Sequence, residues 1–177
     1  MPEKATIDEV NNLPKEEFVA KFGALYEHSP WVAEGAWRER PFGGRSELHL
    51  AFARAMYEAP RDLQLGLIRA HPDLAGKAAV AGELTPESTR EQASAGLGRL
   101  TPEEYEAFTG MNRAYRKRFG FPMIVCVREH TKESILRNAE SRLENSREEE
   151  IEIALGEIAK IARLRLQDLV ELEGGRR

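Results

Sequence analysis

Two short stretches of the chain supply side chains that can transfer protons and hold a small polar molecule. One is His71-Pro72-Asp73-Leu74-Ala75-Gly76, and the other, seventeen residues after His71, is Ser88-Thr89-Arg90-Glu91-Gln92. Together they offer an imidazole, a carboxylate, a hydroxyl and a carboxamide. An unperturbed imidazole titrates near neutrality, so His71 can donate or accept a proton at working pH. Because Pro72 disfavours helical backbone in the residue before it, we expect His71 at a helix end, facing what the loop encloses.

A histidine taken alone is more often a surface residue or a satisfied structural group. This interpretation fits the other three histidines, His28, His49 and His130. For His71 the structural and functional interpretations are equally open on the residues alone.

Ser88 and Glu91 also have two interpretations. Their S-x-x-E spacing is that of a capping box, which would only satisfy amides at a helix start. Thr85-Pro86 supplies a helix start one turn earlier, however, and makes a second box redundant. Inside such a helix Ser88, Glu91 and Gln92 would share one face, suited to a ligand rich in amide-like groups.

An arginine falls on the apolar face of the last predicted helix. At about 100° per residue, Arg165 lies about 20° from the centre of the apolar stripe, and Arg163 lies on the opposite, solvated side. The stripe consists of Ile151, Ala154, Ile158, Ala162 and Leu169. A buried unpaired charge is very costly, so Arg165 needs a partner. That partner is either a ligand in an active site or a buried glutamate in a structural salt bridge.

The segment Phe119-Gly120-Phe121-Pro122 allows two interpretations as well. It can be a helix stop that carries two core aromatics. Alternatively, glycine permits close backbone approach, so that the amides after Pro122 bind a ligand carbonyl. The residues alone do not separate the two.

Composition excludes several classes of protein. The chain has 177 residues, enough for one ordinary domain with a single core at 41% hydrophobic content. Its net charge of −4, with acids and bases interspersed, argues against a nucleic-acid partner. Its longest apolar run, Met123–Val127, is too short to span a membrane. The single cysteine, Cys126, excludes an internal disulfide and a multi-cysteine metal site, and Asp73 beside His71 makes no metal site without further ligands.

Helical signals dominate the chain. Helix starts are predicted at Thr6, Ser29-Pro30, Ser46, Thr85-Pro86, Thr101-Pro102 and Thr131. A helix from about Pro60 must stop near His71, and a long amphipathic helix is expected from about Arg147 to Leu172. The run Met123–Val127 looks extended, but one such segment cannot make a sheet. We therefore predict an all-α fold, a single compact bundle of about eight helices with a long C-terminal helix.

Several motifs occur in an order that resembles a known family. They are HPDLAGK from His71, S-x-x-E-Q-x-x-A-G-L from Ser88 to Leu97, and N-x-x-Y-x-x-x-F-G-F-P from Asn112 to Pro122. The chain resembles the OHCU decarboxylases, which act on 2-oxo-4-hydroxy-4-carboxy-5-ureidoimidazoline in purine breakdown. Glu27-His28-Ser29-Pro30-Trp31 and the segment 161–166 are also similar to that family. The resemblance runs from about Ile7 to Val170, within a single domain over residues 1–177.

This resemblance implies a homodimer with no metal or organic cofactor that releases CO₂ and forms (S)-allantoin by stereospecific protonation. It assigns catalytic roles to His71, Glu91 and Arg165. Substrate-binding roles would fall to Pro72, Ser88, Gln92, Phe121 and Ile124, the last through its backbone. Met123 departs from the family, which more often has phenylalanine there. The polar N-terminus and the absence of a peroxisomal S-K-L tail suggest a cytoplasmic protein, with no nucleic-acid or membrane partner.

Two alternatives to this function remain at the level of sequence. A different cofactor-free lyase or hydrolase could use the same groups on another ureide. A non-enzymatic helical interaction module could use the apolar stripe and Arg165 as a groove, and should then expose an apolar patch of several hundred Å².

Overall fold

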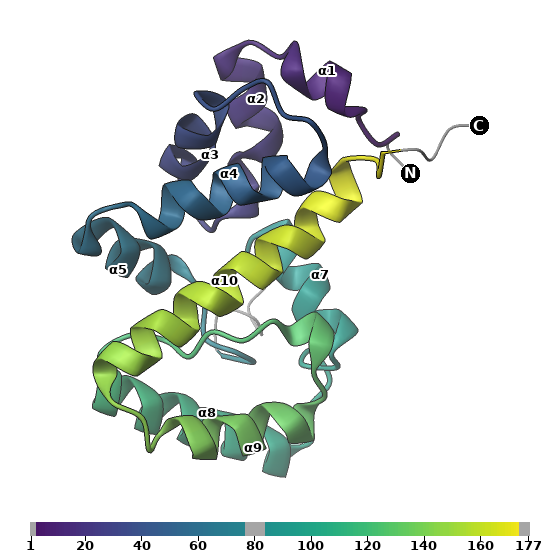
Figure 1. Cartoon of the computed structure of the whole chain (residues 1–177). Coiled ribbons are helices and arrows are strands. Elements are labelled where there is room, and N and C mark those ends of the chain that lie inside the picture. The colour runs from purple at the N-terminus through teal and green to yellow at the C-terminus, as the bar shows by residue number, and fades with distance from the viewer. Residues whose placement is uncertain (1–2, 77–83, 174–177) are drawn as a thin grey trace. The chain divides into compact units, whose positions relative to one another are not determined.

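The computed structural model describes residues 3–76 and 84–173, and these residues form helices and loops (Figure 1). The α-helices are α1 (Ile7–Asn11), α2 (Lys15–Phe22), α3 (Pro30–Trp37), α4 (Arg45–Tyr57), α5 (Arg61–Ala70), α7 (Pro86–Ser94), α8 (Pro102–Phe119), α9 (Lys132–Arg142) and α10 (Arg147–Leu169). Two short 3₁₀ helices are η1 (Gly23–Leu25) and η2 (Val127–Glu129). Extended pairing within the described ranges is limited to one isolated bridge, Ala5 with Val170. The prediction of an all-α fold is confirmed.

Side-chain caps set most of the helix starts, as the sequence predicts. Thr6 with Glu9 and Thr101 with Glu104 form reciprocal capping boxes, and Thr131 pairs with Ser134 in the same way. Thr85 accepts a hydrogen bond from the amide of Ser88 and starts α7.

One predicted cap and one predicted end are wrong. Ser29 is the N-cap residue of α3, as predicted, although its hydroxyl donates to the carbonyl of Glu27 and makes no capping hydrogen bond. Gly44, not Ser46, is the N-cap of α4. Helix α10 ends at Leu169 rather than Leu172, because the carbonyl of Leu169 accepts from the amide of Ala5 and the chain leaves the helix there.

The chain divides into two compact units, and each has its own core. The first consists of residues 1–67 and 159–177. There α2, α3 and α4 pack around aromatic rings, with Phe18 stacked on Phe52 at 5.8 Å between centroids. Phe22, Tyr26 and Phe42 complete this cluster. The prediction of one domain over the whole chain stays a prediction.

The second unit, Ile68–Ile158, is built around α8 and α9, which lie side by side in Figure 1. The inner face of α8 follows helical spacing, with Phe108, Asn112, Tyr115 and Phe119 all buried. Gly120 ends the helix with a φ of 81°, a left-handed conformation that glycine adopts without strain. The chain then continues as the buried extended segment 121–126.

None of the helices among the described residues combines the length and the apolar character needed to cross a membrane.

Candidate active site

His71 lies at the end of α5, as its place before Pro72 predicts. The helix ends at Ala70, the amide of His71 still donates to the carbonyl of Ile68, and the side chain is 8% exposed. The loop continues through Ala75, whose φ of 53° turns the backbone sharply. The last residue of the HPDLAGK motif, Lys77, lies outside the described residues.

Two amide side chains hold this loop by its backbone. From α7, Gln92 accepts from the amide of Ala75 at 3.0 Å and donates to the carbonyl of Asp73 at 3.4 Å. From α8, Asn112 donates to the carbonyl of Leu74 at 2.8 Å. A loop without regular structure needs such partners for its buried peptide groups. The position of His71 therefore depends on two helices that follow it in the sequence.

Helix α7 settles the two interpretations of the S-x-x-E spacing. Because Thr85 caps the helix, Ser88 lies inside the first turn, and the capping-box interpretation of Ser88 with Glu91 is wrong. Ser88 and Gln92 are 5% and 6% exposed. Helix α7 packs against η2, and the charge of Glu91 is among those that raise the pKa of Cys126. Glu91 therefore lies close to the end of the extended segment.

The extended segment presents an unusual row of backbone donors. Met123, Ile124, Val125 and Cys126 are each no more than 3% exposed. None of their four amides donates a hydrogen bond to another residue in the described ranges. Buried amides in folded proteins almost always have a partner. This favours the second interpretation of the Phe119–Pro122 region, in which the amides after Pro122 bind a ligand.

A buried ionic network fixes the carbonyl side of the same segment. Arg142, 4% exposed at the end of α9, donates to the carbonyl of Ile124 at 2.6 Å and to the carboxylate of Glu150 at 2.7 Å. The hydroxyl of Tyr115 donates to the same Glu150 oxygen at 2.6 Å, and Asn145 donates to the other oxygen at 2.8 Å. Glu150 is fully buried, and both of its oxygens accept hydrogen bonds.

Arg165 lies in the first unit, where it is 5% exposed. Its guanidinium donates to the carboxylate of Glu27 at 2.8 Å and to the carbonyl of Ala24 at 3.0 Å. The structural salt bridge, one of the two predicted partners, is therefore present. A planar guanidinium has five donors and can hold a carboxylate while it faces a second anion, so the pair leaves the ligand role open. Arg163 is exposed, as predicted.

The predicted site residues thus fall into two groups. Arg165 belongs to the first unit. The second unit contains the others, which are His71, Pro72, Ser88, Glu91, Gln92, Phe121 and Ile124. Sequence reasoning missed the roles of Glu27, Arg142 and Glu150. For Glu27 a signal existed, because a buried arginine requires a buried acid and Glu27 begins one of the family-like motifs. Within residues 3–76 and 84–173, no cluster of three or more His, Cys, Asp or Glu side chains is arranged to hold a metal ion.

Comparisons with known proteins agree with one another. The family model for OHCU decarboxylase matches residues 11–167. A 2-oxo-4-hydroxy-4-carboxy-5-ureidoimidazoline decarboxylase of Halalkalicoccus jeotgali is 43% identical, over 94% of this chain and 92% of its own. The Haloferax volcanii protein of the same name is 44% identical, over 92% and 95%. The solved structure of an (S)-allantoin synthase superposes with a TM-score of 0.71 at 30% identity, over 93% of this chain and about half (54%) of that one.

Replacing Arg142 should destabilise the protein strongly. Arg142→Met leaves the carboxylate of Glu150 buried without its countercharge, which is expected to lower the free energy of unfolding by about 3–5 kcal/mol. Urea denaturation followed by circular dichroism measures this. Arg54→Met is the control, because Arg54 pairs with Glu39 on the surface and its loss should leave the midpoint nearly unchanged. Equal changes in the free energy of unfolding for the two substitutions would contradict the role of Arg142 as the buried countercharge of Glu150.

The buried thiol of Cys126 should make the free energy of unfolding decrease at high pH. Burial, with the charges of Glu129, Glu157 and Glu91, raises the pKa of its thiol to about 11. The unfolded chain ionises this thiol near pH 8.5, so between about pH 8.5 and 11 only the unfolded state releases the proton. The unfolding free energy should therefore fall with pH in that window by up to about 1.4 kcal/mol per pH unit.

Denaturation of the parent chain and of Cys126→Ala at several pH values isolates this contribution. The free energy of unfolding of the parent minus that of Cys126→Ala should decrease with pH, and only above about pH 8.5. Parallel curves up to pH 11 would show that the thiol titrates normally.

Proposed function

The chain belongs to the OHCU decarboxylase family, and we propose that it converts 2-oxo-4-hydroxy-4-carboxy-5-ureidoimidazoline to (S)-allantoin in urate degradation. The match of the family model to residues 11–167 carries this conclusion. The family is one of lyases, so the chain is an enzyme and the alternative of a non-enzymatic module is set aside. Its substrate is a small ureide.

The chemistry fits the groups of the site. When the bond from the ring to the carboxylate breaks, CO₂ leaves and the electron pair passes into the adjacent imine. A proton is then added to the carbon that carries the ureido group. The ring hydroxyl becomes a carbonyl as it loses its proton, and the former imine nitrogen takes up a proton in its place. Donors near the oxygens and nitrogens that gain charge stabilise this transition state. The substrate accepts the electron pair itself, so the reaction requires no organic electron sink.

His71 and Glu91 are proposed as the catalytic pair. His71 is held at 8% exposure by the loop that Gln92 and Asn112 fix, which supports a role that needs a defined orientation. Glu91 lies on the face of α7 that also carries Ser88. One of the two delivers the proton to a single face of the ring.

Substrate binding is proposed for the remaining residues of the second unit. The carboxamide of Gln92, the hydroxyl of Ser88 and the amide of Ile124 match the donors and acceptors of a ureido group. Pro72 and Phe121 would supply apolar contact with the ring. The amides of the segment 123–126, which donate to no other residue in the described ranges, support this role. Arg165 is proposed as the third essential group, which holds the substrate carboxylate while Glu27 fixes its guanidinium.

The family resemblance also supports a homodimer and a cytoplasmic location, and we propose both. The dimer is measured by sedimentation equilibrium, which should give twice the mass of one chain. The mass of a single chain at micromolar concentration would contradict it.

Substitution of His71 tests the proposed activity. The ureidoimidazoline is generated from urate in situ, and the optical activity of (S)-allantoin is followed after addition of the protein. The parent chain should form one enantiomer rapidly. His71→Ala should lose at least about a hundredfold in rate, because a positioned acid or base contributes that much or more. His49→Gln is the control, since His49 lies on α4 and has no role in the proposed site.

Racemic allantoin at the spontaneous rate with the parent chain would refute the activity. Full activity of His71→Ala would refute only the role of His71.

A further inference from the structure

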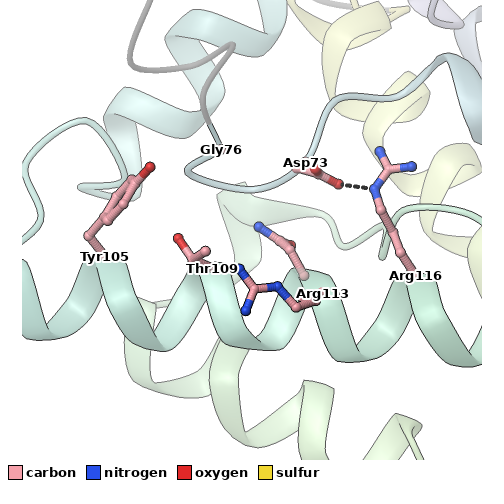
Figure 2. A pocket seen from close by; sticks show the side chains of 7 residues that line it. Asp73, Gly76, Tyr105, Thr109, Arg113 and Arg116 are labelled. Atoms are coloured by element: carbon pink, nitrogen blue, oxygen red, sulfur yellow. Dashed lines mark hydrogen bonds and ion pairs between the residues drawn. The ribbon is translucent and has the colours of Figure 1, made fainter.

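The second unit contains a pocket of about 310 Å³ that the proposed reaction does not use. Helix α8 lines it with Tyr105, Thr109, Asn112, Arg113 and Arg116, and the loop that follows His71 lines it with Asp73. Figure 2 shows the labelled α8 side chains along one side of the helix, facing the loop. Their spacing of three to four residues places them on a single helix face. None of the proposed catalytic or substrate-binding residues lines this pocket.

The pocket carries one positive charge without a countercharge. Arg116 donates to the carboxylate of Asp73 at 2.9 Å, so these two charges compensate each other (Figure 2). The guanidinium of Arg113 makes no hydrogen bond or ion pair with any other residue in the described parts of the chain. The hydroxyl of Thr109 lies one turn before Arg113 on the same face. A guanidinium beside a hydroxyl suits a carboxylate.

One lining residue of the pocket has a buried acceptor that lacks a donor. This residue, Asn112, is the only buried one among the described lining residues, at 8% exposed. Its Nδ2 donates to the carbonyl of Leu74 at 2.8 Å, and only the nitrogen can do so, which fixes the orientation of the amide. Its Oδ1 is buried and accepts no hydrogen bond from the described residues. A buried oxygen in this state favours an occupant that brings an N–H.

We propose that this pocket binds a small carboxylate that also carries neutral N–H donors, as a ureido acid does. The carboxylate lies against Arg113 and Thr109, and an N–H donates to Oδ1 of Asn112. An amino acid fits less well, because Arg116 already neutralises Asp73 and no other carboxylate of the described lining remains to balance an ammonium group. The site is separate from the one that includes His71, and its existence does not rest on the proposed activity.

Calorimetric titration of the full chain with hydantoate (N-carbamoylglycine) tests the ligand class. Hydantoate carries a ureido group and a carboxylate, acetate carries only the carboxylate, methylurea carries only the ureido group, and glycine replaces the ureido group by ammonium. Hydantoate should bind at least about tenfold more tightly than any of the other three. No binding of hydantoate up to about 20 mM, or equal binding of glycine, overturns the proposal.

Three variants locate the binding site. Arg113→Gln should weaken hydantoate binding at least about tenfold, because it removes the charge without breaking any hydrogen bond or ion pair among the described residues. Lys117→Gln is the matched control, since Lys117 is an exposed cation on α8 outside the pocket, and binding should stay within twofold. His71→Ala should also bind normally. Loss of binding in His71→Ala, or unchanged binding in Arg113→Gln, would place the ligand elsewhere and refute the assignment.

Discussion

The structure depends on how a helical protein accommodates a buried stretch of backbone that belongs to no helix. Segment 121–126 lies in the interior, where each peptide group needs a hydrogen-bond partner. Arg142 supplies one for the carbonyl of Ile124, and Glu150 neutralises that arginine. Burying such a pair is costly and seldom gains stability over apolar residues of the same volume. Its benefit here is geometric, because one planar guanidinium ties together three elements and fixes the direction in which the amides of the segment point.

The first unit uses the same chemistry to a different end. Arg165 is also buried and paired with one glutamate, Glu27, and with one backbone carbonyl. The hydrogen-bond partners of Arg142 are groups of the protein itself, and these contacts explain its burial by a structural role. Arg165 lies in a motif that resembles the decarboxylases, and a fixed cation is what a substrate carboxylate requires. In both cases the carboxylate partner orients the guanidinium before anything else binds to it. Such preorganised charge loses little energy to reorganisation when the reaction occurs.

Local rules predicted the helices well because their causes are local. A threonine with an acid or hydroxyl three residues on makes its own cap, and the inner face of α8 follows from spacing alone. The errors have distant causes. Helix α10 ends early because Ala5, more than 160 residues away, takes its last carbonyl. Glu150 follows Glu148 and Glu149 in the sequence, and only the tertiary partners Tyr115 and Arg142 determine which of the three is buried.

A decarboxylase without an external electron sink needs two things from its protein, donors for the charge that develops and a proton from one side only. Residues 123–126 are buried, so charge that developed beside their amides, as proposed, would meet fixed dipoles rather than water. Exclusion of water matters equally for stereochemistry. A solvated intermediate would be protonated on both faces and give racemic allantoin, whereas an enclosed one can take its proton only from a side chain. Backbone that is buried and firmly held would thus serve rate and stereospecificity through the same feature.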